Sequence, residues 1–334
     1  MEKNMKREML DINEKYFWSP AITWKINNDN LEIAVFEYSG IAIEYFPKFY
    51  YITQDGITID KLLESFSNYD SNLMLGFVKD LIKNRILVHG ILAPHELFYT
   101  QDRLFESPYN EDILYNPEKY DAYKHDQMTR SFKNCKNDKI SLNVDYEFPA
   151  SITERITHRE FDEGRKVPFE TFCKLISVFR QKNVAGHPRY NYASAGGLYP
   201  IDIFLYIKDN RVEGVKAGLY YYNPLDNSIE LVSDTCVISE EAHFHTNKKI
   251  YNSSAFSLFA IYDAQVTMPK YSGMGYLYAF IDTGIMVELL TQVAELNNIG
   301  LCSIGDMNFK RIEKYFKLYK SHIFLHDIEI GLKK

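Results

Sequence analysis

The sequence predicts an α+β fold built from two domains, and three observations support this prediction. The chain has 334 residues, which is enough for about two domains. Apolar residues make up 46% of it, so a packed core is expected, and its 16 glycines and 11 prolines exclude fibrous and low-complexity classes. Segments that alternate apolar and polar residues are interspersed with segments of helical spacing, which indicates both strands and helices.

Residues 31–52 are predicted to form two strands. Residues 31–35 alternate apolar and polar side chains, Ser39-Gly40 offers a turn, and residues 41–46 resume the strand pattern. A helix is expected at about 58–67.

A second helix begins after Asp70, whose side chain is a good N-cap, and residues 86–88 close the unit as a strand. This order of strands, helix, helix and strand is winged-helix-like. Nucleic-acid binding is not expected, because the whole net charge of −7 lies in residues 1–150. A winged helix can instead accept a peptide by strand addition, and a purely structural domain is the alternative.

Three regions follow from these patterns. Residues 1–90 are predicted to be a winged-helix-like domain with a peptide-recognition role. Residues 91–150, rich in tyrosine, asparagine and charge, are a connecting region with some helix. Residues 151–334 form the second domain.

The second domain is predicted to be a mixed sheet around one buried helix. A helix starts at Pro168, since proline suits a first helical turn. Residues 278–297 are apolar on most sides, which predicts the core helix, with Gly300 just past its end. The predicted strands are 201–207, 218–222, 229–232, 255–262, 301–304 and 322–330.

Two segments of this domain could bind a ligand. The small residues of Ser194-Ala195-Gly196-Gly197-Leu198 would let a backbone approach a flat or phosphorylated ligand, although an ordinary tight turn is the alternative. Arg155, Thr157 and Arg159 would share one side of an extended segment and suit a phosphate or a flavin edge. A solvated charged segment is the alternative there, and His158 is expected to be incidental.

Two further motifs carry weaker signals. The strand that ends at Ile304-Gly305 could offer backbone N–H groups to a ligand, and Cys302 within it is expected to be a small buried hydrophobe. Lys270 beside Tyr271 could transfer a proton if burial lowers the lysine pKa.

No metal site is predicted. His243 and His245 form a His-x-His pair, but no third ligand is placed near them, so they are expected to be surface histidines. The cysteines, which lie far apart and form no CxxC motif, fit a reducing cytoplasm; they are Cys135, Cys173, Cys236 and Cys302. No signal peptide is recognised, and no uninterrupted apolar run of 18 residues exists, so a membrane span is not expected.

Taken in order, these motifs resemble the SagB/McbC-type dehydrogenases of the flavin-dependent nitroreductase-like superfamily. The similarity covers about residues 150–331, and the string 194–200 is quite specific to this subgroup. The carrying segments are Arg155-x-Thr157-x-Arg159, Ser194-Ala195-Gly196-Gly197-Leu198-Tyr199-Pro200, Gly218-Leu219-Tyr220-Tyr221-Tyr222, Lys270-Tyr271 and Gly300-Leu301-Cys302-Ser303-Ile304-Gly305.

The resemblance implies a nitroreductase-like domain that binds FMN at a homodimer interface. Arg155, Thr157 and Arg159 would hold the phosphate and ribityl chain. Residues 194–198 would lie along the flavin ring from the partner subunit, and Ile304-Gly305 would offer a backbone N–H to it.

The resemblance also implies a reaction. Lys270 and Tyr271 would provide the base that helps to oxidise a thiazoline or oxazoline in a ribosomally made peptide to the azole. Cyclodehydratase proteins would be partners. One departure concerns the core helix, where Glu288 stands at a position that is glutamine in many members; if buried, this carboxylate would need a partner.

Three other interpretations remain open. The protein could be a free-standing oxidase that acts on carrier-bound heterocycles in nonribosomal peptide synthesis. It could be a peptide-binding scaffold without turnover. A nitroreductase fed by NAD(P)H is a further alternative, but it leaves residues 1–150 unexplained.

Overall fold

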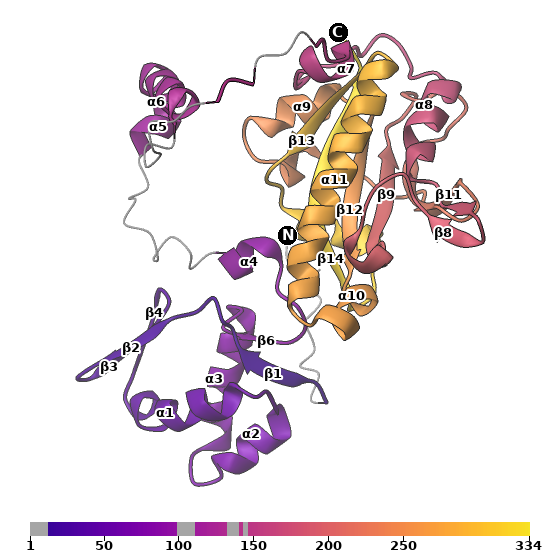
Figure 1. The fold of residues 1–334 in the computed structure, drawn as a ribbon. Coiled ribbons are helices and arrows are strands. Elements are labelled where there is room, and N and C mark those ends of the chain that lie inside the picture. Colours follow the sequence, from indigo (N-terminus) through magenta and orange to yellow (C-terminus); the bar gives the residue numbers. More distant parts are fainter. Residues whose placement is uncertain (1–12, 99–110, 132–139, 143–145) are drawn as a thin grey trace. The chain divides into compact units, whose positions relative to one another are not determined.

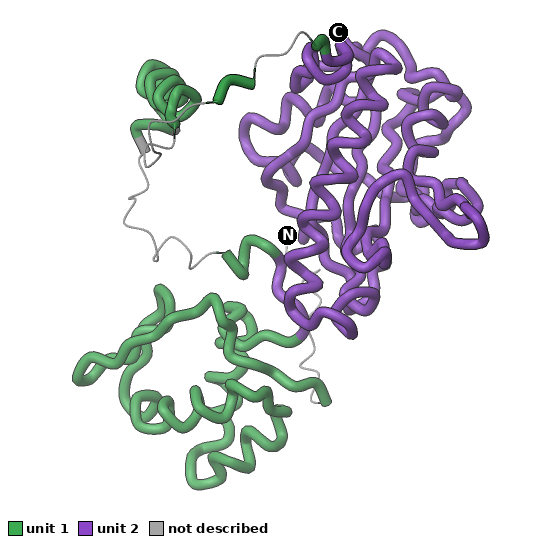
Figure 2. The backbone as a smooth tube through the Cα atoms, in the orientation of Figure 1, with its two compact units in different colours: residues 1–89, 94–147 green, residues 90–93, 148–334 purple. Residues whose placement is uncertain are grey.

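A computed structural model describes residues 13–98, 111–131, 140–142 and 146–334. The chain divides into two compact units, which Figure 2 shows in different colours. The first unit comprises residues 1–89 and 94–147, and the second comprises residues 90–93 and 148–334. Each unit contains its own cluster of buried apolar side chains.

The first unit contains a helical core and two small sheets. In one three-stranded sheet the order is β5-β1-β6, and in the other it is β2-β3-β4. Aromatic side chains dominate the core, where the rings of Trp18 and Trp24 both pack edge-on against Phe46. The elements of this core are β1 (Lys15–Trp18), β2 (Trp24–Asn27), β3 (Asn30–Ile33), β4 (Phe36–Ser39), α1 (Ile41–Thr53), β5 (Ile57–Thr58), α2 (Ile59–Ser65), α3 (Ser71–Lys83) and β6 (Leu87–Val88).

The prediction of a second strand at residues 41–46 is wrong, because this segment begins helix α1 (Figure 1). The predicted first strand forms as β3, but it pairs with β2 and β4, and Ser39-Gly40 precedes the helix instead of joining two strands. The buried side chains of α1 recur every three or four residues, at Ala42, Tyr45, Phe46 and Phe49. A short apolar run fits either period, and here packing against the aromatic core decides for the helix.

The cap predicted at Asp70 is confirmed, since its carboxylate accepts hydrogen bonds from the backbone N–H groups of Asn72 and Leu73 at the start of α3. The connecting region contains short helices among its described residues. Their bounds are α4 (Pro94–Phe98), α5 (Glu111–Tyr115) and α6 (Pro117–Thr129).

The second unit is built on a six-stranded sheet with the strand order β11-β10-β9-β12-β14-β13. The expectation of mixed strand directions is corrected, because every described ladder of this sheet is antiparallel. Alternation of apolar residues predicts a strand but not its direction, which depends on the connections between strands. The strands are β9 (Ile201–Ile207), β10 (Gly218–Asn223), β11 (Ser228–Ser233), β12 (Phe256–Asp263), β13 (Ile299–Ile304) and β14 (His322–Leu332).

Helix α11 (Met274–Leu296) is the predicted core helix, and it runs along the sheet in Figure 1. By length and composition alone it is also apolar enough to cross a membrane, with a mean hydropathy of 1.3. In this structure one side of it packs within the unit, where Ala279, Met286 and Leu290 are buried. Another side leaves Ile281 and Ile285 exposed. Core packing therefore accounts for the apolar residues on one side of the helix only.

Shorter helices complete the second unit. They are α7 (Ala150–Thr153), α8 (Phe169–Ile176), α9 (Asn247–Ser253) and α10 (Ala264–Tyr271), with single 3-10 turns η2 to η6. A small hairpin is formed by β7 (Lys182–Val184) and β8 (His187–Arg189).

The predicted role of Gly300 is wrong, because Gly300 lies inside β13 rather than at the end of α11. The left-handed residue after the helix is Asn298, with φ 55°. Gly300 pairs with Gly331 of β14, and the ring of Phe161 covers both glycines. An added Cβ on Gly300 would lie 2.9 Å from the His158 Cβ atom, so this close approach explains the glycine.

Candidate functional site

The glycine-rich segment forms a tight turn directly before β9. Ala195–Gly197 make one turn of 3-10 helix, in which Gly196 and Gly197 have φ of +65° and +67°. An added Cβ on Gly197 would meet open space. On Gly196 it would lie 2.8 Å from Lys270 Nζ and overlap the Tyr271 hydroxyl oxygen. The loop therefore lies directly against Lys270 and Tyr271, and a glycine at position 196 permits this contact.

Lys270 and Tyr271 are the last two residues of α10. The lysine ammonium lies 4.9 Å from the centre of the Tyr271 ring, and that ring packs edge-on against Tyr278 of α11. Lys270 is exposed and Tyr271 is half-buried. The expectation that the lysine is desolvated is therefore not met by the residues of one chain, and a bound ligand or a second subunit would have to cover it.

Asp282 of α11 holds the loop in place, a role that the sequence did not reveal. Its carboxylate accepts a hydrogen bond of 2.6 Å from Ser194 Oγ and one of 3.2 Å from the Ala195 N–H. The same Ser194 oxygen accepts a bond from the Tyr199 N–H at 2.9 Å, which closes the turn.

Asp282 is itself only 3% exposed. Burial raises its pKa, while the Ser194 and Ala195 donors act in the opposite direction. The signal in the sequence was a single acidic residue on the apolar side of the core helix. By contrast, Glu288 on this helix is exposed and accepts a hydrogen bond from Gln292, so the expected problem of a buried carboxylate does not arise there.

The arginine segment runs past the edge strand β13. The His158 N–H donates to the Leu301 carbonyl at 3.1 Å, and the charge of Arg159 acts on the Cys302 thiol. Arg155 and Arg159 are exposed, while Thr157 is half-buried. These donors are open to an anionic ligand.

The expectation that His158 is incidental is wrong. Its ring is largely buried and its Nε2 lies 3.5 Å from the Glu295 carboxylate of α11. Together with its backbone bond to Leu301, this contact fixes the segment between the edge of the sheet and the core helix.

The end of β13 lies beside a cavity of about 340 Å³. An added Cβ on Gly305, the residue after this strand, would meet nothing within 4 Å, so its backbone can be approached closely. Ile304 is buried and Gly305 is exposed. The cavity is lined mostly by α11 and the adjoining strands, through Phe280, Thr283, Gly284, Val287, Glu288, Ser303, Leu325 and His326.

The loop and the arginine segment lie at different places along α11. Asp282 holds the loop and Glu295 faces His158, and thirteen residues of helix correspond to about 20 Å. Figure 1 shows the same separation, with α10 beside one end of α11 and α7 beside the other. The predicted ligand-binding residues therefore lie at two separate places in one chain.

Comparisons with known proteins concern mainly the second unit. The profile of the Nitroreductase family matches residues 152–326. The microcin B17-processing protein McbC of Escherichia coli is 29% identical over 154 residues, which are 42% of this chain and 52% of McbC. Indigoidine synthase of Dickeya dadantii (strain 3937) is 31% identical over 98 residues, 28% of this chain and 6% of that protein. The chain thus spans about half of McbC and a small part of indigoidine synthase.

One solved structure resembles the chain beyond the matched domain. It is a chain of the E. coli microcin synthetase McbBCD complex with truncated pro-MccB17 bound, with a TM-score of 0.54 and 21% identity. The similarity covers 81% of this chain and 97% of that chain. The predicted α+β class with a nitroreductase-like domain, and the predicted resemblance to the SagB/McbC type, are confirmed.

Proposed function

This chain belongs to the nitroreductase family, and from that premise we propose that it is an FMN-dependent oxidoreductase that converts azolines in a peptide to azoles. The observation that carries the proposal is the contact between the glycine loop and Lys270-Tyr271. It joins Gly196 to Lys270, which are 74 residues apart in the sequence. The similarity to McbC supports the peptide chemistry.

The residues of this chain fit a flavin. Arg155, Thr157 and Arg159 offer two guanidinium groups and a hydroxyl to the phosphate and its neighbouring chain. The backbone of Gly305 is open on the side where a Cβ would stand, so a flat ring can reach its N–H. When bound, a flavin would supply the acceptor for the two electrons of the oxidation, with oxygen as the final oxidant.

The protein supplies the base and its orientation. We assign proton removal from the azoline ring carbon to Lys270 Nζ, with the Tyr271 hydroxyl beside it. The loop contact at Gly196 limits where both groups can lie. A lysine accepts a proton at pH 7 only when it is partly neutral, so the proposal requires that substrate, flavin and a second subunit cover Lys270.

We propose that two copies of the chain complete each site. The separation of the arginine segment and the glycine loop along α11 supports this, because the loop of one copy can then face the arginine segment of the other. The exposed apolar residues Ile281 and Ile285 of the same helix are suited to such an interface.

We assign peptide recognition to the first unit. Among the described residues, the outer strands of its sheets pair on one side only, so a peptide could extend them by strand addition. The similarity to a chain of the McbBCD complex, which holds a truncated propeptide, supports this assignment and the expectation of cyclodehydratase partners. A cytoplasmic location remains a prediction.

A second candidate is an oxidase that acts on carrier-bound heterocycles in nonribosomal peptide synthesis. The match to indigoidine synthase favours it. The first unit favours the ribosomal peptide, since the matched segment of indigoidine synthase covers only 28% of this chain.

The test uses the purified full chain with FMN and a synthetic peptide that carries one thiazoline. We expect a yellow protein that releases FMN on denaturation, and a product lighter by two hydrogen atoms in mass spectrometry. Lys270→Ala should keep the flavin and slow the oxidation about 10²–10⁴-fold, the usual effect of removing a general base. The exposed Lys216→Ala is the matched control.

Two results would contradict the proposal. Oxidation by Lys270→Ala at the wild-type rate would remove the lysine from the mechanism. A colourless protein that takes up no added FMN would favour the scaffold interpretation.

A further inference from the structure

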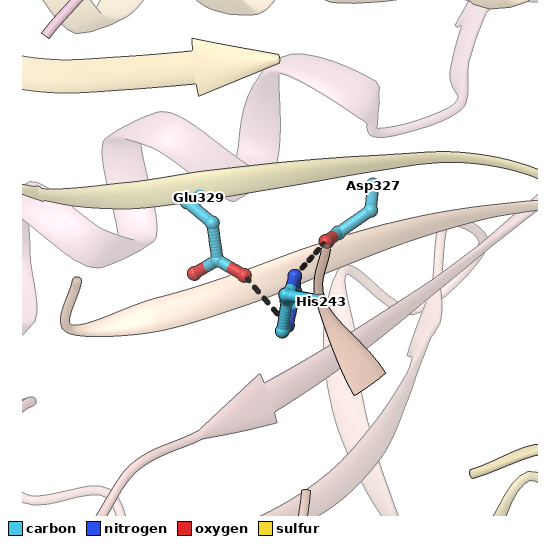
Figure 3. Close-up of side chains that lie close together, drawn as sticks. All are labelled: His243, Asp327 and Glu329. Carbon is cyan, nitrogen blue, oxygen red and sulfur yellow. Dashed lines mark ion pairs between the residues drawn. The ribbon is translucent and has the colours of Figure 1, made fainter. Parts of the chain in front are cut away.

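A buried cluster on the second unit is not used by the proposed reaction. The His243 ring lies between the carboxylates of Asp327 and Glu329, as Figure 3 shows, and all three side chains are fully buried. Asp327 and Glu329 are two residues apart on β14, so they point to the same face of the sheet. The prediction that His243 is a surface histidine is therefore wrong, whereas His245 is exposed. An isolated bridge to Met307 and stacking on Tyr251 hold the ring inward.

The polar atoms of this cluster are not hydrogen-bonded to each other. His243 Nδ1 lies 3.8 Å from Asp327 Oδ2, and His243 Nε2 lies 3.9 Å from Glu329 Oε1. Both ring nitrogens and both Asp327 oxygens lack a hydrogen-bond partner among the described residues. Such distances are about 1 Å too long for hydrogen bonds, and a buried polar atom without a partner is costly.

The protonation state of the His243 ring determines which of its nitrogens needs a hydrogen-bond donor. Burial lowers the pKa of His243 to about 4, and the nearby charge of Lys208 adds to this effect. The imidazole is therefore neutral near pH 7, with one N–H and one lone pair. Since a carboxylate faces each nitrogen, one lone pair points at an acceptor.

The charges within the cluster are also unbalanced. Glu329 accepts hydrogen bonds from Ser254 and Ser257, and Lys208 donates to the same Ser254 hydroxyl at 2.8 Å. Lys208 thus compensates Glu329. Asp327 accepts no side-chain hydrogen bond among the described residues. Burial together with the charge of Glu329 raises its pKa well above the usual range, while the charge of Lys208 and the Ile328 backbone act in the opposite direction. A proton or a cation beside Asp327 would relieve the remaining imbalance.

The spacing suits a metal ion. One ligand atom from each of the three residues lies within 4.8 Å of the others. In a tetrahedral zinc site with bonds of about 2.0–2.1 Å, neighbouring ligand atoms are about 3.4 Å apart. The separations of 3.8 and 3.9 Å start from different ring nitrogens, and one ion can bind only one of these nitrogens. The three ligand atoms of one site lie within 4.8 Å of one another, so they would have to approach one another by up to about 1.4 Å to close around an ion.

We propose that His243, Asp327 and Glu329 form a structural binding site for a divalent transition-metal ion of the zinc class. One imidazole nitrogen and two carboxylates are ligands that such ions accept. The ion would neutralise the two carboxylates and link the chain around His243 to strand β14. This proposal is independent of the flavin and of the peptide substrate.

The test uses the untagged full chain, first stripped with a chelator and then exposed to zinc chloride. We expect about one zinc ion per chain after gel filtration, measured by plasma mass spectrometry, and a rise in Tm of at least about 3 °C. His243→Gln and Asp327→Asn should abolish both effects. His245→Gln, which changes the exposed histidine of the same His-x-His pair, is the matched control and should retain them.

Asp327→Asn also tests the competing explanation, in which a protonated Asp327 donates a hydrogen bond to His243. An asparagine amide can replace that donor, so a wild type that does not respond to zinc and an Asp327→Asn variant of unchanged Tm would overturn the proposal. If the variants do not fold, X-ray absorption at the zinc edge of the wild type decides. Nitrogen and oxygen neighbours at about 2.0–2.2 Å support the site. Neighbours that are mainly sulfur, or retention below about 0.1 zinc per chain, overturn it.

Discussion

Asp282 and Asp327 are two buried carboxylates of the same unit with opposite surroundings. Asp282 accepts hydrogen bonds from Ser194 and Ala195, and both donors belong to the loop that it positions. Neither oxygen of Asp327 has a hydrogen-bond partner among the described residues, and the His243 ring beside it is neutral near pH 7. Burial raises the pKa of both groups, but only Asp282 has donors that oppose the shift strongly.

The difference shows how a buried charge can serve two purposes. Where the fold itself supplies the donors, the carboxylate becomes a fixed anchor for a functional loop. Where the fold supplies no such donors, the buried carboxylate is stabilised by binding a proton or a cation from solution. Stability should therefore fall when Asp282 is replaced. Around Asp327 it should change with pH and with added metal.

Asp282→Ala tests the first half of this comparison and has the largest expected effect on stability. It removes the acceptor for two hydrogen bonds to a charged group, so the free energy of unfolding should fall by about 3 kcal/mol. Urea denaturation measures the change, and FMN occupancy should fall with it. Glu288→Ala, on the exposed side of the same helix, should stay within about 0.5 kcal/mol of wild type. Equal losses for both variants would remove Asp282 as an anchor.

The pH dependence of His243 tests the second half. Its pKa of about 4 in the folded chain lies below the ordinary 6.5, so its contribution to stability is fully present above pH 6.5 and is lost as the pH falls towards 4. In metal-free protein, the stability difference between wild type and His243→Gln should shrink by about 2 kcal/mol between pH 7 and pH 5.

Urea denaturation of both proteins at each pH measures this change. Lys208, Asp327 and Glu329 also titrate. Their contribution cancels in the stability difference between wild type and variant where the substitution leaves their pKa values unchanged. A difference that stays constant over this range would show that His243 titrates normally.

The smallest expected effect distinguishes backbone strain in the loop 194–198 from the contact of this loop with Lys270 and Tyr271. Gly196→Ala and Gly197→Ala both place a side chain at positive φ, but only the first meets Lys270 and Tyr271. Gly196→Ala should therefore be the more destabilising by about 1 kcal/mol, as expected for local overpacking. Thermal unfolding followed by circular dichroism measures this difference. Equal shifts would indicate that the loop moves away from Tyr271.

The sequence predicted the parts of the fold in which one pattern dominates. Strand β9 occupies the predicted residues 201–207, and the core helix was found within a few residues. Local chemistry was equally reliable at Asp70, whose cap needs only the backbone N–H groups two and three residues further along the chain.

Predictions failed where distant contacts decide the outcome. The run 41–46 is apolar enough for a strand or a helix, and only the aromatic core around Phe46 selects the helix. His243 was placed at the surface because its ligand-type neighbours, Asp327 and Glu329, are more than 80 residues away in the chain. For the same reason, Asp282 could be seen as an unusual residue in a core helix but not as the partner of Ser194.

The paired glycines of β13 and β14 determine where the arginine segment lies. Phe161 fits over Gly300 and Gly331 because neither carries a side chain, and His158 approaches Gly300 for the same reason. These contacts fix two points, His158 and Phe161, of the seven-residue segment from Arg155 to Phe161. The position of any ligand bound by the two guanidinium groups would therefore depend on Gly300 and Gly331, although neither glycine would touch that ligand.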